Sequence, residues 1–178
     1  MPSLKRIVTV VGLLLGMAVL AAAGGQTDAS LQARLKRLFP NAAEFSPKGG
    51  EPPHITAYGG GERGGKTVLG YAFWTTELVP LERGYSGPIA MLVGIDTKGV
   101  LTGVVVGEHH EPYGDFSIDR PEFAAQFRNK DVRAPFALGR DVDAVSRATI
   151  TMSSAVRAIR NASRRIARAL LTPPGAKP

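Results

Sequence analysis

The sequence predicts an α+β fold: a small, mostly antiparallel sheet with packed helices, preceded by an N-terminal signal or anchor helix. Three observations predict it. An apolar run follows a basic N-terminus, β-rich segments occupy the middle of the chain, and an amphipathic helix closes it. The 178 residues suffice for one domain and a short additional segment. The absence of cysteine excludes disulfides, thiolate metal sites and cysteine nucleophiles.

The first 24 residues carry an export signal. Lys5 and Arg6 precede an uninterrupted apolar run over residues 7–23, which ends in small residues. The run is near the lower limit for a membrane span and slightly long for the core of a signal peptide. We therefore expect residues 1–24 to be either a cleaved signal peptide or an uncleaved anchor whose basic end lies in the cytoplasm. Both alternatives place the rest of the chain in the periplasm, free or tethered to the inner membrane.

Residues 25–66 predict a short helix and then a loop. Ser30 is placed to cap a helix that runs to Phe39, and Pro40 ends it. The following stretch is rich in glycine and proline, which favours loop structure, with a strand near His54–Tyr58.

The middle of the chain predicts the sheet. Residues 68–75, 89–95 and 100–108 are strand candidates, and the Asp-Thr-Lys-Gly sequence that ends at Gly99 predicts a hairpin turn. A short helix is expected over residues 121–127, because proline is tolerated in a first helical turn.

The last element, over residues 153–171, has helical spacing on two faces. The apolar face consists of Met152, Val156, Ile159, Ile166 and Leu170. The opposite face carries arginines at 157, 160, 164 and 168; it is expected to be solvated, to lie on anionic lipid, or to dock an acidic redox partner. A nucleic-acid partner is not expected, given the export signal. We expect one domain over residues 67–172 and a tail over 173–178.

The approach to this helix is rich in hydroxyl groups. Five occur within nine residues: Ser146, Thr149, Thr151, Ser153 and Ser154. They favour either of two interpretations. The hydroxyls cap the helix by accepting hydrogen bonds from its first amides, or the helix start binds a phosphate, with Arg147 as a bidentate partner.

The sequence Asp-Ala-Val-Ser-Arg-Ala-Thr, residues 143–149, resembles the flavinylation motif of FMN-binding domains, usually Asp-x-x-Ser/Thr-Gly-Ala-Thr. Such domains occur in the G subunit of the Rnf complex, in the C subunit of the sodium-translocating NADH:quinone reductase and in the periplasmic part of NosR. The resemblance extends over residues 70–171 and is strongest to the NosR type, in the motifs Gly-Tyr-Ala-Phe, Arg-Gly-Tyr-Ser-Gly-Pro-Ile, Leu-Val-Gly-Ile-Asp, Gly-Val-Leu-Thr-Gly and Glu-His-His-Glu-Pro.

The resemblance implies one FMN per chain, joined through its phosphate to Thr149 by a flavin transferase that uses FAD. Asp143, Ser146 and Ala148 match the motif, whereas Arg147 stands where the family has glycine. Glycine would be needed there for a positive φ or for close approach of the transferase. Alternatively, the position faces the phosphate and an arginine assists; we favour this second explanation.

Two further motifs are interpreted with the same resemblance. The loop from Gly84 to Pro88 is a plain turn or, equally, approaches the flavin, with Tyr85 stacked on the ring and Ser86 and Gly87 beside it. His109 is a candidate to tune flavin protonation. A metal site at His109 and His110 is not expected, because adjacent strand residues point to opposite faces.

The resulting functional prediction is an exported electron carrier and not an enzyme. Its partners would be a membrane or periplasmic redox protein of a respiratory chain, with denitrification implied only by the resemblance to NosR. One alternative is a binding or scaffold module of a membrane redox complex that has lost its flavin. Another is a flavin-dependent reductase, although the sequence offers no convincing acid–base pair for such chemistry.

Overall fold

The computed structural model describes residues 29–61 and 65–172. The chain divides into two compact units, Met1–Leu35 and Lys36–Pro178. In the first unit, residues 29–35 are helical; in the second, residues 36–38 are helical. The predicted signal or anchor segment, residues 1–24, lies outside the described residues. Within the described part of the chain, no helix has the length and apolar character needed to cross a membrane.

The second unit contains a five-stranded sheet in which each strand is antiparallel to the next along the chain. The strands are β1 (Glu44–Phe45), β2 (Ile55–Gly60), β3 (Lys66–Trp74), β4 (Met91–Asp96) and β5 (Leu101–Val106). The prediction of an α+β fold with an antiparallel sheet is confirmed. The sheet includes two strands from the segment that we expected to precede the flavin domain. The predicted turn also forms, with Gly99 at a φ of 86° between β4 and β5.

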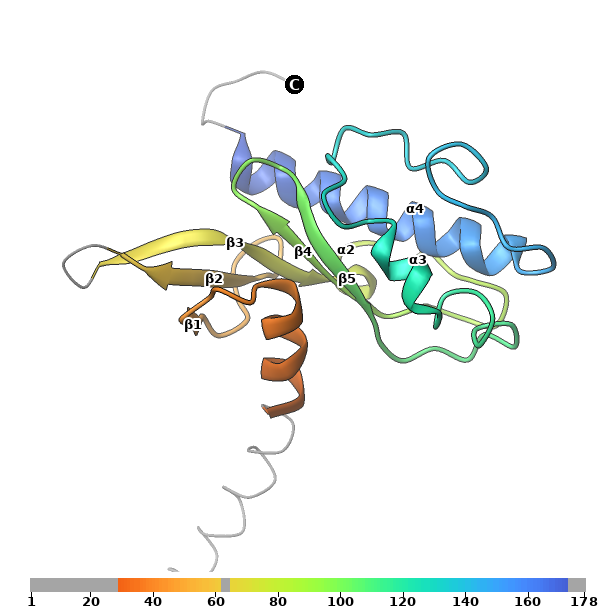
Figure 1. Cartoon of the computed structure of the whole chain (residues 1–178), viewed down its shortest axis with the longest axis horizontal. Helices are drawn as coiled ribbons and strands as arrows, with labels where there is room; N and C mark the ends of the chain where they lie inside the picture. The colour runs from red at the N-terminus through yellow and green to blue at the C-terminus, as the bar shows by residue number, and fades with distance from the viewer. Residues whose placement is uncertain (1–28, 62–64, 173–178) are drawn as a thin grey trace, which may run out of the picture. The chain divides into compact units, whose positions relative to one another are not determined.

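Helices lie between and after these strands along the chain. They are α2 (Thr75–Leu78), α3 (Pro121–Ala125) and α4 (Thr149–Ile166), and α4 continues into the π-helical segment η2 (Ala167–Leu171). Figure 1 shows α4 passing along one face of the sheet, with its last turns beside the turn between β4 and β5. The single turn of α2 was not predicted, because the residues before it read as a strand that continues to Thr75.

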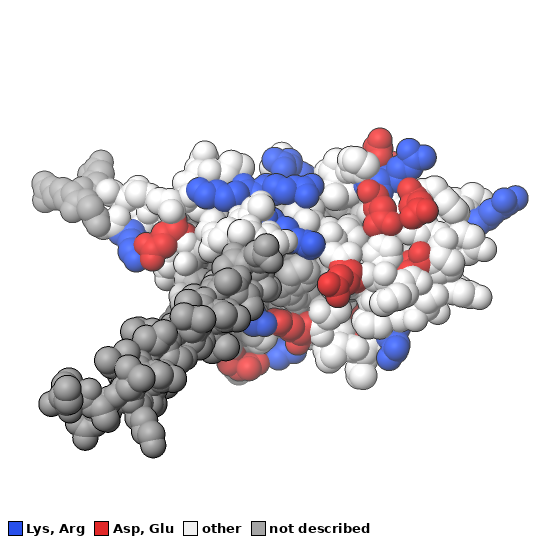
Figure 2. Space-filling model, turned by 90° about the horizontal axis from the view of Figure 1, so that it is seen from below, with Lys and Arg blue, Asp and Glu red and all other residues white. Residues whose placement is uncertain are grey.

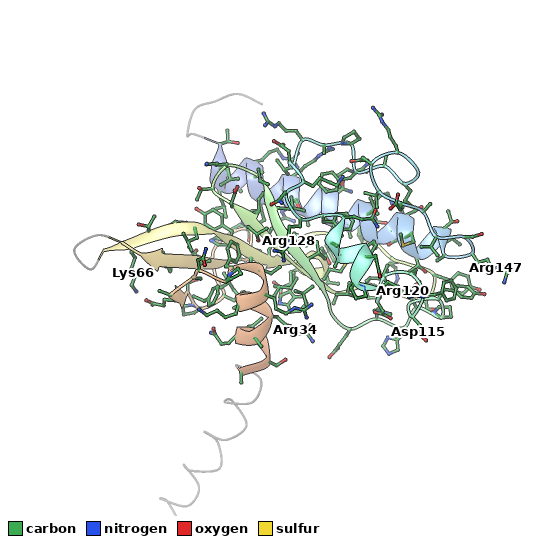
Figure 3. All side chains as sticks on the ribbon, viewed as in Figure 1. Arg34, Lys66, Asp115, Arg120, Arg128 and Arg147 are labelled. Atoms are coloured by element: carbon green, nitrogen blue, oxygen red, sulfur yellow. The ribbon has the colours of Figure 1, made fainter. Side chains whose placement is uncertain are left out.

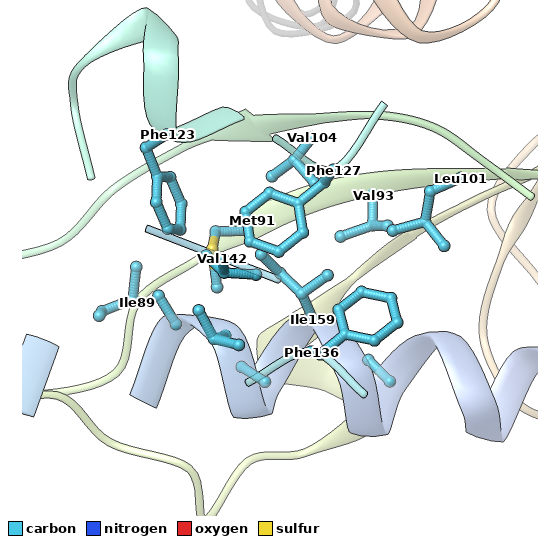
Figure 4. Packing of buried hydrophobic residues seen from close by; sticks show 14 of the residues in the cluster. Ile89, Met91, Val93, Leu101, Val104, Phe123, Phe127, Phe136, Val142 and Ile159 are labelled. Atoms are coloured by element: carbon cyan, nitrogen blue, oxygen red, sulfur yellow. The ribbon is translucent and has the colours of Figure 1, made fainter. Parts of the chain in front are cut away.

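The core lies between the sheet and α4, where Ile159 meets residues from β4 and from the loop after α3 (Figure 4). Met91, Phe127, Phe136 and Ile159 are among its largest fully buried side chains. Of the predicted apolar face, Leu170, in η2, is partly buried against the core, and Met152, Val156, Ile159 and Ile166 are buried. Each such side chain stabilises the fold by about 1.5–3 kcal/mol relative to an exposed position. This packing fixes α4, and therefore also the position of its first turn.

Candidate functional site

A pocket of about 250 Å³ lies at the start of α4. Three segments that are distant in the sequence line it: Tyr85 from the loop before β4, Tyr113 from the loop after β5, and residues 147–151. Among the described residues, five large hydrophobic side chains are exposed: Leu81, Tyr85, Tyr113, Phe116 and Ile150. Three of them line this pocket, and Phe116 packs on Tyr113 with ring centroids 5.5 Å apart. Exposed aromatic and aliphatic surface of this kind is typical of ligand or partner sites.

The first turn of α4 has no side-chain cap. The residue at the N-cap position is Ala148, which has no hydroxyl, and no side chain hydrogen-bonds in its place. The backbone N–H of Met152 donates to the carbonyl of Ala148 at 2.8 Å, and the first turn contains no acidic residue. The capping interpretation of the hydroxyl-rich segment is therefore wrong. The amides that precede this first helical bond, together with the helix dipole, favour an anion at the pocket.

The two threonines in this turn have different environments. Thr149 is exposed and lines the pocket. Thr151 is only 1% exposed, and its hydroxyl donates to the carboxylate of Glu111. Ser146 is exposed but is not part of the pocket lining. Thr149 is thus the accessible hydroxyl at the helix start, whereas that of Thr151 is committed to the interior.

Arg147 adopts a backbone conformation that favours glycine. Its φ is 70°, in the left-handed region, where a side chain with a Cβ costs about 1–2 kcal/mol. The requirement for positive φ therefore accounts for the glycine that the family motif has at this position, and it was the explanation that we did not favour. Figure 3 places Arg147 at the tip of the loop before α4, and Figure 2 shows a basic group at that end of the molecule. Phosphate binding by its exposed side chain stays a prediction.

Glu111 is the site residue that the sequence did not reveal. Its side chain is buried beside the pocket, and it accepts hydrogen bonds from the backbone N–H groups of Tyr85 at 3.0 Å and Ser86 at 2.8 Å. Burial of the carboxylate tends to raise its pKa. The hydrogen bonds from Thr151 and from the amides of Ser86, Tyr85 and Gly87 outweigh that effect, so the pKa lies below its ordinary value. Glu111 is therefore ionised at neutral pH.

His109 hydrogen-bonds the backbone of Glu111 and is not among the residues that line the pocket. Its Nδ1 accepts the backbone N–H of Glu111 at 3.2 Å, which leaves Nε2 protonated to donate to Asp119 at 2.8 Å. Gly114 packs against this pair, since a Cβ there would lie 2.5 Å from the His109 ring. The observed contacts give His109 a structural role in the turn that carries Glu111, and its predicted role in flavin protonation stays a prediction. No cluster of three metal-binding side chains occurs in the described ranges.

The structure brings some of the predicted site residues together and separates others. Tyr85, Ala148 and Thr149 share the pocket with Arg147. Ser86 and Gly87 contribute backbone amides to the carboxylate of Glu111, next to the pocket. Asp143 is exposed, and its backbone N–H donates to the Gln126 side chain at 2.6 Å. It lines a separate pocket of about 240 Å³, between α3 and the approach to α4.

Fold and pocket together define a small α+β domain in which exposed aromatic side chains stand beside an uncapped helix start, a combination suited to an anionic ligand. The sequence model of the FMN-binding domain family matches residues 84–164, from the loop that holds Tyr85 to the interior of α4. The G subunit of an ion-translocating oxidoreductase complex from Methanosarcina acetivorans is 33% identical over 139 residues, 72% of this chain and 70% of that protein. The chain belongs to the FMN-binding domain family.

For two other relatives, the match covers a smaller share of the relative's own length. The regulatory protein NosR of Stutzerimonas stutzeri is 31% identical over 135 residues, which are 70% of this chain but 18% of NosR. The G subunit of the Haemophilus influenzae ion-translocating oxidoreductase complex is 51% identical over 47 residues, 26% of this chain and 21% of that protein. This chain thus corresponds to a limited part of NosR and to most of the Methanosarcina protein.

The pocket fits FMN in the two respects that the structure can test. FMN combines a planar apolar ring with a phosphate. The exposed side chains of Tyr85, Tyr113 and Ile150 offer surface for a ring, and the amides before Met152 offer donors to a phosphate. At about 250 Å³, the pocket is smaller than most ligand pockets, which usually measure about 300–1,000 Å³, so it would enclose only part of an FMN molecule.

Proposed function

We propose that this protein is an electron-transfer flavoprotein that carries one FMN covalently on Thr149. The observation that carries the proposal is the contrast between the two threonines of the first turn of α4. The hydroxyl of Thr149 is exposed at the pocket, whereas that of Thr151 is buried and bonded to Glu111. Both lie within the match to the FMN-binding domain family.

Attachment would make a phosphoester. A bond forms between the Oγ1 atom of Thr149 and the FMN phosphorus of FAD, the bond between the two FAD phosphates breaks, and AMP leaves. The hydroxyl proton passes to a flavin transferase, which the chain would need as a maturation partner. The first-turn amides and the dipole of α4 would stabilise the remaining negative charge of the phosphodiester, and the exposed guanidinium of Arg147 would add a charge-assisted contact.

Bound FMN would supply reversible transfer of one or two electrons. The chain's own residues would orient it: Tyr85, Tyr113 and Ile150 present apolar surface and exclude water from the part of the ring that they cover. A covalent link would retain the cofactor outside the cytoplasm, where the N-terminal segment is predicted to direct the domain. We propose a membrane or periplasmic redox protein of a respiratory chain as the partner, since two relatives are named as subunits of ion-translocating oxidoreductase complexes.

Co-expression of the full chain with a flavin transferase tests the attachment. In-gel flavin fluorescence and peptide mass spectrometry should place the label on Thr149, and Thr149→Ala should abolish it. Thr149→Ser retains a hydroxyl and should be labelled, and Ser153→Ala is the matched control that leaves the site intact. Thr151→Ala is a poor control, because it also removes the hydrogen bond to Glu111.

A folded, unlabelled wild-type chain after co-expression with several transferases would overturn the covalent proposal. That outcome would favour a binding or scaffold module that has lost its flavin, for which the arginine at the glycine position is the motivating observation.

A further inference from the structure

The buried carboxylate of Glu111 joins three segments of the site. Its partners are the amides of Tyr85 and Ser86, 26 and 25 residues away along the chain, and the hydroxyl of Thr151, 40 residues away. Glu111 is 7% exposed and contacts no lysine or arginine in any ion pair found among the described residues. A buried carboxylate without a cation is costly unless hydrogen bonds satisfy it. Here, the amides of Tyr85 and Ser86 and the hydroxyl of Thr151 donate those hydrogen bonds from the two sides of the pocket.

The loop that holds Tyr85 is shaped to fit this carboxylate. The backbone N–H of Gly84 donates to the carbonyl of Gly87 at 2.7 Å, which closes the loop into a tight turn. A Cβ at Gly84 would lie 2.5 Å from Oε1 of Glu111, and one at Gly87 would meet no atom within 4 Å. Of the two glycines in the turn, Gly84 is therefore the one that the carboxylate requires.

We infer that Glu111 is a positioning residue of the flavin site, which holds the turn of residues 84–87 against the first turn of α4. The carboxylate binds the turn through backbone amides and α4 through Thr151, so it sets the spacing between the Tyr85 side of the pocket and Thr149. Its link to the flavin rests on the proposed function, whereas its link to the loop does not. The hydrogen bond from the backbone N–H of Glu111 to His109, together with the contact of His109 with Asp119, holds the backbone that carries the carboxylate.

Asp141 provides a matched comparison elsewhere in the fold. It accepts the backbone N–H groups of Phe136 at 3.1 Å and Ala137 at 2.6 Å, and it also contacts the Lys130 ammonium at 3.1 Å. It is likewise a carboxylate that holds a loop through consecutive amides. None of these residues lines the pocket at the start of α4. Asp141→Asn should therefore reproduce the loss of stability that comes from weakening such a loop, without affecting the pocket at the start of α4.

Hydrogen exchange of the full chain without flavin is the first test. In Glu111→Gln, the amides of Tyr85 and Ser86 should exchange about tenfold to one-hundredfold faster, because hydrogen bonds to a charged acceptor are lost or weakened. Exchange in the middle of α4 should stay unchanged. Asp141→Asn should speed exchange at Phe136 and Ala137 and leave Tyr85 and Ser86 as they are.

Four further substitutions separate the carboxylate contacts from general destabilisation. Gly84→Ala should accelerate exchange at Tyr85 and Ser86 as Glu111→Gln does, whereas Gly87→Ala should leave exchange at these two amides unchanged. Thr151→Val should also loosen the loop, and Thr151→Ser, which restores the hydroxyl, should recover protection.

Flavin attachment is the second test. With a transferase present, Glu111→Gln should lower the labelled fraction or leave the bound flavin more mobile, as measured by fluorescence anisotropy, whereas Asp141→Asn should match the wild type. Unchanged exchange at Tyr85 and Ser86 in Glu111→Gln would overturn the inference even if labelling succeeds. Altered exchange with no labelling of the wild type would instead contradict the proposed function and leave the loop contact established.

Discussion

Two isoleucines of α4, Ile150 and Ile159, experience opposite environments within one helix. Ile159, halfway along, is fully buried against β4 and Phe136, whereas Ile150, in the first turn, is 58% exposed and lines the pocket. The middle of the helix therefore supplies stability, and its start is left uncapped, with exposed hydroxyl and apolar groups. A rigid, well-packed helix can hold a reactive first turn in place, because stability at one end does not depend on burial at the other.

Ile159→Ala should have the largest effect on folding. It removes atoms from a fully buried position, so the free energy of unfolding should fall by about 2–5 kcal/mol. Urea unfolding followed through Trp74 fluorescence measures the change. Ile159→Val is the graded control and should cost about 0.5–1.5 kcal/mol. A loss below the value for Ile159→Val would show that α4 is not packed as described.

Acidification should destabilise the fold through carboxylates that accept backbone hydrogen bonds. The pKa values of Glu111 and Asp141 lie below their ordinary values of 4.5 and 3.8, so both groups bind protons more readily when the chain is unfolded. Their contributions are complete above those ordinary values and are lost as the pH falls through the lower, folded-state pKa values. Unfolding free energy should therefore decline below about pH 4.5.

Glu111→Gln or Asp141→Asn should make that decline shallower. Asp131, whose pKa is lowered to about 2 by Arg133, also contributes to the loss of stability at low pH. High salt should reduce that contribution, because the Asp131–Arg133 pair is exposed. Stability that rises on acidification would contradict the hydrogen-bonded state of these carboxylates.

Arg147→Gly should have a smaller, stabilising effect. Glycine removes the strain of the left-handed backbone at a φ of 70° and costs some unfolded-state entropy, for a net gain of about 1 kcal/mol or less. Arg140→Gly, at an exposed arginine without positive φ, should destabilise slightly. If the guanidinium also binds the phosphate, fluorescence anisotropy should show that the attached flavin is more mobile in Arg147→Gly than in the wild type. If only the left-handed backbone conformation matters at this position, the mobility of the flavin should be unchanged.

Ile150→Ala should have the smallest effect on stability, within about 0.5 kcal/mol, because its side chain is mostly exposed in the folded chain. On labelled protein, however, it should make flavin fluorescence more accessible to iodide quenching. An equal loss of stability in Ile150→Ala and Ile159→Ala would remove the distinction between the two ends of α4.

The sequence predicted the parts of this molecule whose signals are local. The helical spacing of α4, the turn at Gly99 and the hydroxyl-rich segment before α4 each depend on neighbouring residues, and all of them are present in the structure. The role of Glu111 could not be predicted in that way. Its partners lie 25 to 40 residues away, and a glutamate beside two histidines is an ordinary polar segment until the fold brings those partners together.

Backbone conformation was the other feature that could not be predicted from the sequence. Arginine gives no sign of a positive φ, so only the comparison with the family's glycine hinted at the geometry of Arg147. Likewise, the prediction that hydroxyls cap α4 followed from composition, but the N-cap falls on Ala148, between the hydroxyl-bearing residues. A shift of one residue in a helix start decides whether a threonine caps the helix or faces the pocket.

The intact mass of the protein purified from its native cells most directly tests the central claim, that the exposed hydroxyl at the start of α4 carries FMN. We expect one FMN per chain, as an increase equal to the mass of FMN less one water, which maps to Thr149 and is absent in Thr149→Ala. A folded, colourless protein with the mass of its bare polypeptide would contradict the account.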